Sequence, residues 1–212
     1  MSEPIKVPTM AEYMAEGKKP EVLFWVGCAG SFDDRAKKIT KAFVKLLHCP
    51  HCFNTIKNEY PELGGNYEVV HHTQFLKSLL NEGRLKVEGG KFKGKKITFH
   101  DPCYLGRANG EYEAPRDLLR KLEVELVEMK RCKSRGLCCG AGGAQMFKEP
   151  EEGKKDVNME RTEEALETQP KVIAAACPFC NTMMTDGVKG KNQEGDVAVM
   201  DVAEMIASAD DL

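Results

Sequence analysis

Short apolar runs alternate with longer amphipathic stretches in the second half of the chain. Runs typical of buried strands cover residues 97–100, 124–129, 172–176 and 197–201. Stretches with helical spacing cover residues 114–122, 158–167 and 202–207, and Pro178 is placed to open a further helix. Strands that alternate with helices predict a parallel α/β sheet, in which ligands collect beyond the carboxyl ends of the strands.

Three blocks of the sequence occur twice, in the same order. An apolar run that ends in cysteine covers residues 22–28 and 96–103, and a Cys-Pro-X-Cys motif stands at 49–52 and 177–180. A valine-containing run followed by a helical stretch covers residues 67–80 and 197–207. We therefore expect two copies of one α/β unit, a first half at residues 1–92 and a second at 93–212. Between them, the Gly- and Lys-rich residues 88–96 are expected to form a solvated connector.

The first half is expected to be truncated. Cys103 and Cys177 are 74 positions apart, whereas Cys28 and Cys49 are only 21 apart, so the first copy is 53 residues short. A helical stretch at 33–47 runs almost directly into Cys49, with no strand between them. The part without a counterpart is the middle of the unit, which an internal deletion explains.

Composition and charge exclude several classes of protein. Of 212 residues, 42% are hydrophobic and 30% charged, which is ordinary for a globular chain. The formal net charge is −2, so there is no basic excess for a nucleic-acid partner. The polar start is not a secretory signal, and the longest strongly apolar stretch, at 22–30, is too short to cross a bilayer. We expect a cytoplasmic protein that reaches a membrane, if at all, through a partner.

Cysteine is the abnormal residue, with nine in the chain. In a reducing compartment cysteines are more plausibly metal ligands or catalytic thiols than disulfides. Five of the six in the second half follow one pattern, which is Cys103, 34 residues, Cys138-Cys139, 37 residues beginning with Gly140, and Cys177-Pro-Phe-Cys180. Thiolates arriving from three segments suit a soft metal or an iron–sulfur cluster.

The glycine-rich loop after the paired cysteines allows close approach of the backbone. Gly140, Gly142 and Gly143 are the candidate cofactor-binding residues, because their N–H groups can form a nest for cluster sulfides. Cys132 falls outside the pattern and is interpreted as a buried small hydrophobe.

The spacing C-x34-CC-x37-CPFC, with Gly140 directly after the paired cysteines, resembles the cysteine-rich CCG domain of heterodisulfide reductase. Related bacterial proteins with this domain include lactate utilisation protein A and the iron–sulfur subunit of anaerobic glycerol-3-phosphate dehydrogenase. The sequences at 25–33 and 100–107 are similar to this bacterial branch. The resemblance begins at Glu21 and covers nearly the whole remaining chain. It implies two pseudo-symmetric Rossmann-like halves.

The resemblance also implies a [4Fe-4S] cluster, of noncubane type in heterodisulfide reductase. Its five ligands, carried onto this chain, are Cys103, Cys138, Cys139, Cys177 and Cys180. In the first half Cys28, Cys49 and Cys52 remain, one short of four thiolates, so a second cluster is a weaker expectation. His51 and His72 are possible nitrogen ligands there, but an exposed loop residue and a packed helix-entry residue are the favoured interpretations.

The expected function is that of an iron–sulfur oxidoreductase or electron-transfer subunit, resembling heterodisulfide reductase. Its partners would be flavin or iron–sulfur subunits of a redox complex, with no nucleic acid. The organic substrate, the electron donor and the acceptor are not specified by the sequence.

Three alternatives remain open. Cys49-Pro-His-Cys52 alone matches a thiol–disulfide oxidoreductase, but such a site needs a preceding strand. A structural zinc module would use fewer, closer ligands than three distant segments provide. A non-catalytic metal-binding scaffold subunit is the third, and the shortened first half favours it. No motif for nucleophilic hydrolysis, phosphoryl transfer or dinucleotide binding is found.

Overall fold

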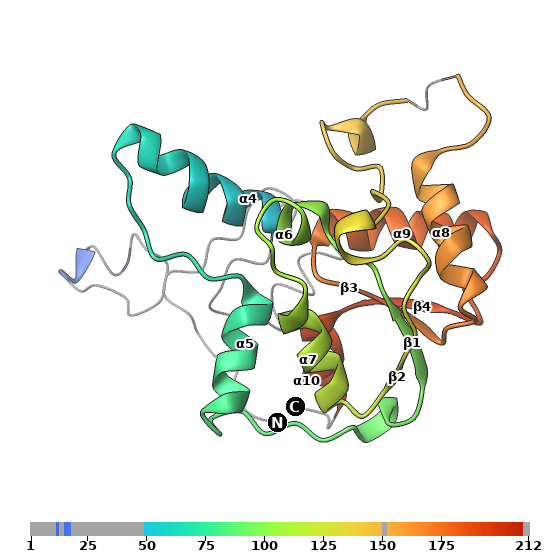
Figure 1. Ribbon diagram of the computed structural model, residues 1–212, viewed down its shortest axis with the longest axis horizontal. Helices are drawn as coiled ribbons and strands as arrows, with labels where there is room; N and C mark the ends of the chain where they lie inside the picture. The colour runs from blue at the N-terminus through green and yellow to red at the C-terminus, as the bar shows by residue number, and fades with distance from the viewer. Residues whose placement is uncertain (1–11, 13–14, 18–48, 150–151, 210–212) are drawn as a thin grey trace.

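A four-stranded parallel sheet organises the part of the chain that the structure describes (Figure 1). The computed structural model of the protein describes residues 12, 15–17, 49–149 and 152–209. The strands are β1 (Lys96–Phe99), β2 (Glu125–Leu126), β3 (Val172–Ala175) and β4 (Ala198–Asp201), in the order β2-β1-β3-β4. All three pairings are parallel, which confirms the predicted α/β class. The strand expected at 22–28 and the helix expected at 33–47 lie outside the described residues.

Helices cover both faces of the sheet. They are α4 (Pro50–Asn54), α5 (His72–Asn81), α6 (Cys103–Gly106), α7 (Glu113–Lys121), α8 (Val157–Glu167), α9 (Pro178–Gly190) and α10 (Val202–Ala209). Figure 1 shows α5, α7 and α10 gathered on one side and α8 and α9 on the other. The helices predicted at 114–122, 158–167 and 202–207, and the one opened by Pro178, are therefore confirmed.

The alternation of side chains along β3 explains the two cores. Val172 and Ala174 pack in the cluster with α5, α7 and α10, whereas Ile173 packs in the cluster with α8 and α9. All four residues of β3 are buried, as expected for a central parallel strand covered on both faces. The apolar run in the sequence thus reflects burial on both sides.

Three local expectations are corrected. The strand predicted at 124–129 has only two residues, because Glu128 turns away to pair with Arg116 through a 2.6 Å contact. Residues 67–70 match the run at 197–201 in the repeated blocks but form no strand, and His71 makes a single bridge before α5 begins. The connector is not fully solvated, since Phe92 in the turn Gly90–Phe92 is only 3% exposed and joins the core.

The segment after α4 forms an arm beside α6. It continues as a π-helical turn, Thr55–Glu59, and a 3-10 turn, Tyr60–Leu63. Short 3-10 turns also occur at Lys133–Arg135 and Gln145–Phe147.

Among the described residues, no helix combines the length and apolar character needed to cross a membrane.

Candidate metal centre

Five of the six second-half cysteines meet beyond the carboxyl ends of β1 and β3. Cys103 is the first residue of α6, four positions after β1 ends, and Cys177 is the N-cap of α9, two positions after β3 ends. Pro178 at the first position of α9 turns the chain so that Cys180 lies in the first helical turn. Cys138 and Cys139 come from the loop between the turns Lys133–Arg135 and Gln145–Phe147. Three segments thus converge on one site.

The five thiols are in continuous contact. Cys139, Cys177 and Cys180 share one buried cluster, and Cys138 packs against it. The Cys138 sulfur accepts hydrogen bonds from the thiols of Cys103 and Cys139. The Cys180 thiol in turn contacts both Cys139 and Cys177. The structure therefore brings together all five residues expected from the sequence.

Mutual contact divides these thiols into proton donors and acceptors. Hydrogen bonds from Cys103 and Cys139, together with the Gly140 N–H at 3.3 Å, hold the pKa of Cys138 far below its usual range. Burial acts to raise the pKa of Cys177, but hydrogen bonds from Cys180 and His51 outweigh it and lower that pKa to about 5. Two sulfurs of the five are therefore poised as thiolates.

The other three thiols hold their protons more tightly than an ordinary cysteine. The contact with Cys138 raises the pKa of Cys139 to about 12 and raises that of Cys103 even further. Contact with Cys139 likewise raises the pKa of Cys180 well above its usual value. Packed thiolates repel one another, and a metal cation is the charge that removes this repulsion. The donor set accordingly fits a soft, thiolate-bound metal centre.

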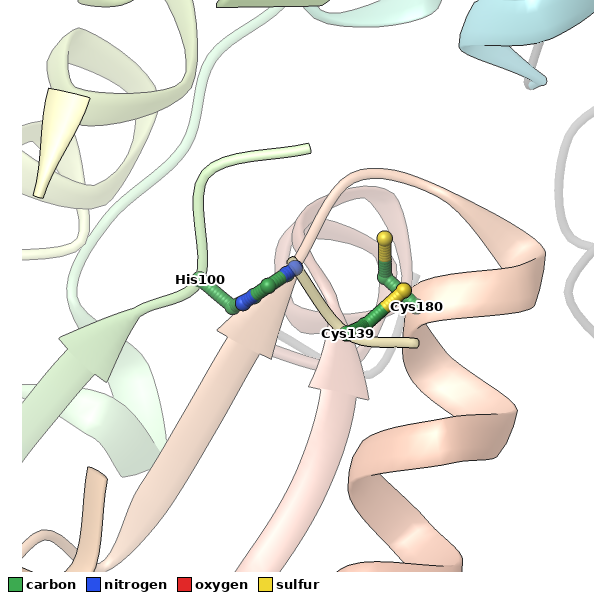
Figure 2. A group of neighbouring side chains, drawn as sticks. All are labelled: His100, Cys139 and Cys180. Atoms are coloured by element: carbon green, nitrogen blue, oxygen red, sulfur yellow. The ribbon is translucent and has the colours of Figure 1, made fainter. Parts of the chain in front are cut away.

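His100 is a further site residue, and the spacing of the cysteines does not reveal it. A ring nitrogen of His100 and the sulfurs of Cys139 and Cys180 lie within 4.8 Å of one another, and all three residues are buried. Figure 2 shows the ring extending from the end of β1 towards the two sulfurs. Burial and the neighbouring Arg161 guanidinium lower the pKa of His100 to about 3. Its position next to a strand end, three residues before Cys103, is the signal in the sequence.

A buried donor without a partner also lies next to the site. Arg161 contacts His100, and its Nη2 has no hydrogen-bond partner among the described residues. Such a donor suits an anion or a sulfur atom bound nearby. The observation agrees with a cofactor that carries acceptor atoms, such as the sulfides of a cluster.

The glycine loop contributes one observed contact. Gly140 has a φ of 90°, a conformation that glycine adopts without strain, and its N–H points to the Cys138 sulfur. Gly142 is half-buried and Gly143 is exposed. The wider role predicted for this loop stays a prediction.

The Cys49-Pro-His-Cys52 motif of the first half lies beside the thiol cluster of the second half. Cys49 is the N-cap of α4, and Cys49 and Cys52 contact each other. The His51 ring lies 4.3 Å from that of Tyr104 and 5.5 Å from that of Phe179, between centroids, and it contacts Cys177. Burial acts to lower the pKa of His51, but Cys177 outweighs it, so the pKa is raised. His51 is therefore not the exposed loop residue favoured from the sequence.

The remaining candidates are placed apart from the thiol cluster or lie outside the described residues. His72 is the packed helix-entry residue expected, fully buried with its Nε2 3.3 Å from Asp201 Oδ1. Cys132 is half-buried rather than the buried small hydrophobe expected, and the charges acting on it come from carboxylates and arginines rather than from thiols. Cys28 lies outside the described residues.

Comparison with known proteins shows a family match over the segment that carries this site. Residues 97–185 match the cysteine-rich domain family CCG. The chain is 38% identical to a probable iron–sulfur-binding oxidoreductase, FadF, of Bacillus subtilis over 96% of its own length. Residues 97–185 are therefore a CCG cysteine-rich domain. The CCG match includes the five contacting cysteines and His100, and it also includes Cys132.

Two further relatives of this chain carry oxidoreductase names. It is 37% identical to the EtfAB:quinone oxidoreductase of Syntrophomonas wolfei over 92% of this chain. It is 36% identical to a heterodisulfide reductase component of Methanosarcina barkeri over 84% of this chain. The chain spans only 36%, 35% and 46% of the FadF, S. wolfei and M. barkeri proteins, less than half of each.

The alignment with FadF contains more positions than this chain has residues. It covers 256 positions, whereas 96% of the 212 residues is about 204, so about 52 positions have no counterpart here. This number is close to the 53 residues by which the two cysteine spacings differ. The comparison agrees in size with an internal deletion.

Proposed function

We propose that this chain is an electron-transfer part of an iron–sulfur oxidoreductase. The convergence of five thiols at the carboxyl ends of β1 and β3 carries the proposal. The proposed ligands are Cys103, Cys138, Cys139, Cys177 and Cys180, and the proposed cofactor is one [4Fe-4S] cluster of noncubane type. Such a cluster, when bound, supplies one-electron transfer.

The protein's own residues prepare the site for that cofactor. The three sulfurs with raised pKa values must release protons when they bind metal, so loading is expected to become weaker as the pH falls. Cys139, Cys177 and Cys180 are buried, so water is excluded from their side of the thiol cluster. The Gly140 N–H donates to the Cys138 sulfur, which stabilises its negative charge.

Partner subunits and location follow from the same proposal. The relatives' names include a quinone oxidoreductase and a component of a heterodisulfide reductase, which favours a flavin or iron–sulfur partner here. Quinone, flavin and thiol acceptors are the chemical classes to test. We place the protein in a reducing cytoplasm, in keeping with the free thiols of the described cysteines.

The organisation into halves at 1–92 and 93–212 belongs to the proposal too. Cys49 and Cys52 lie beside Cys177, and with Cys28 they are one thiolate short of a cage. We propose that the first half holds no intact cluster of its own.

One observation favours a second candidate, a structural zinc site. His100, Cys139 and Cys180 offer one nitrogen and two sulfurs within 4.8 Å, and small N/S sets suit zinc. A zinc-binding scaffold protein without redox chemistry is therefore the alternative.

Anaerobic reconstitution of the full chain separates these two. Iron and acid-labile sulfide are counted per chain after loading, and zinc is offered separately to the apoprotein. About four of each are expected for one cluster. About eight would show a second cluster in the first half, and tight zinc binding without any sulfide uptake would replace the redox proposal by the scaffold one.

A further inference from the structure

A histidine–arginine pair borders the thiol cluster. His100 follows β1 and is 1% exposed, and Arg161 on α8 is fully buried. The Arg161 Nε donates a hydrogen bond to His100 Nδ1 at 2.9 Å. These two residues are 61 positions apart in the sequence, so only the fold pairs them.

This contact fixes where the histidine carries its proton. A guanidinium group has donors only, so His100 Nδ1 must accept with its lone pair. The single proton of the ring then lies on Nε2. Arg161 is itself held in place, because its Nη1 donates to the Arg131 carbonyl at 2.8 Å and to Glu164 Oε2 at 3.1 Å.

The remaining ring N–H is directed at the sulfurs. Figure 2 shows a ring nitrogen of His100 at the tip of the side chain, on the side of Cys139 and Cys180. The ligand atoms of the three residues lie within 4.8 Å of one another. Ligation of a metal through Nε2 would require a ring with no proton at all, since Nδ1 is already an acceptor.

We propose that His100 is a hydrogen-bond donor to the sulfur atoms of the bound cluster and that Arg161 is the positioning residue that fixes its tautomer. His100 is then not a metal ligand, although it lies among them. The inference rests on the proposed iron–sulfur function and deepens it. Hydrogen bonds to cluster sulfurs stabilise the more negative, reduced state, so this pair raises the reduction potential.

The matched variants are His100→Leu and His100→Gln in the full, anaerobically reconstituted chain. Leucine removes the donor. The glutamine amide oxygen is able to accept from Arg161 while its N–H₂ group donates to sulfur, so it preserves the proposed arrangement. Both variants are expected to keep the iron and sulfide content of the wild type.

The reduction potential is the deciding measurement. In His100→Leu the ratio of reduced to oxidised cluster at a fixed applied potential is expected to fall about tenfold, a shift of about 59 mV for one electron. His100→Gln is expected to stay near the wild-type value, and Arg161→Gln to shift in the same direction as His100→Leu. Arg131→Gln is the control, because Arg131 also pairs with Glu164 but holds Arg161 only through its main-chain carbonyl.

Spectroscopy of the wild type tests the inference without any variant. Pulsed EPR in D₂O is expected to detect an exchangeable deuteron near the cluster, and ¹⁵N-labelled histidine to give the weak coupling of a nitrogen not bound to iron. A strong, direct ¹⁵N coupling, loss of iron in both His100 variants, or an unchanged potential in His100→Leu would overturn the inference. Failure of the wild type to bind iron and sulfide would instead overturn the proposed function.

Discussion

Cysteines of the same sequence neighbourhood have different surroundings in this protein. Cys138 contacts two thiols and a backbone N–H, whereas Cys132, six positions earlier, faces Glu128, Asp101 and nearby arginines. Burial and these carboxylates raise the pKa of Cys132, which makes it a poor metal ligand. The two sulfurs differ in their surroundings because the chain places Cys138 among thiols and Cys132 among charged side chains.

Cys138→Ser is therefore expected to abolish cluster binding, because it removes the thiolate that contacts both Cys103 and Cys139. Cys132→Ser is expected to retain the full iron and sulfide content. Both are measured by iron and sulfide analysis after reconstitution. Loss of iron in the Cys132 variant would show that a ligand has been misassigned.

Arg116 neutralises a buried carboxylate, that of Asp101. Its guanidinium is fully buried, donates to both Asp101 oxygens at 2.8 and 2.9 Å, and also pairs with Glu128. Arg116→Met leaves the buried Asp101 carboxylate without its cation, so the free energy of unfolding is expected to fall by about 3–5 kcal/mol.

The matched control is Arg120→Met on the same helix. Arg120 is 55% exposed and pairs with Asp117 and Glu113 on the surface, so its loss is expected to cost less than about 1 kcal/mol. Urea unfolding of the apoprotein measures both. Equal losses in the two variants would contradict the role given to burial.

Contact between elements limits residue size where α8 crosses α9. A Cβ on Gly187 would lie 2.0 Å from Thr162 Oγ1 and 2.8 Å from Thr162 Cβ. Gly187→Ala is therefore expected to force the helices apart and lower the free energy of unfolding by about 1–3 kcal/mol. Because α9 carries Cys180, the same change is expected to weaken cluster retention.

Gly190→Ala is the control at the end of the same helix. There a Cβ would meet only the flexible end of Met159, at 3.0 Å, so the change is expected to stay within about 1 kcal/mol. Thermal unfolding and iron retention in a chelator compare the two variants. A Gly187 variant as stable as the Gly190 variant would show that α8 and α9 are not closely packed.

The elements predicted from the sequence are those whose burial produces a local pattern. β1 and β3 are apolar runs because the sheet is covered on both faces. Pro178 marks the start of α9, and the proposed ligands Cys177 and Cys180 lie within one helical turn of it. β2 is shorter than its apolar run predicts because Glu128 leaves the edge of the sheet for Arg116. The role of His100 is not predictable from the sequence because it depends on a contact with Arg161. The two residues are distant in the sequence, and no motif spacing encodes their contact.

At the scale of the whole molecule, the first-half motif lies against the second-half site. Asn54 and Asn58 each hydrogen-bond Asn109, at 3.1 and 3.0 Å, which holds the arm after α4 against the segment that follows α6. Cys49 and Cys52 are thereby held close to Cys177, yet they contact each other rather than the remaining ligand thiols. Proximity alone does not assign them to the same metal.

The double variant Cys49→Ser, Cys52→Ser decides whether these thiols bind iron. If the second half alone holds the cofactor, the variant is expected to keep about four iron and four sulfide per chain, because all five proposed ligands remain. The matched double variant Cys177→Ser, Cys180→Ser is expected to lose both. Iron and sulfide analysis with Mössbauer spectroscopy checks the count and the cluster type. A parallel loss of iron in the two double variants would show that both Cys-Pro-X-Cys motifs serve one shared centre.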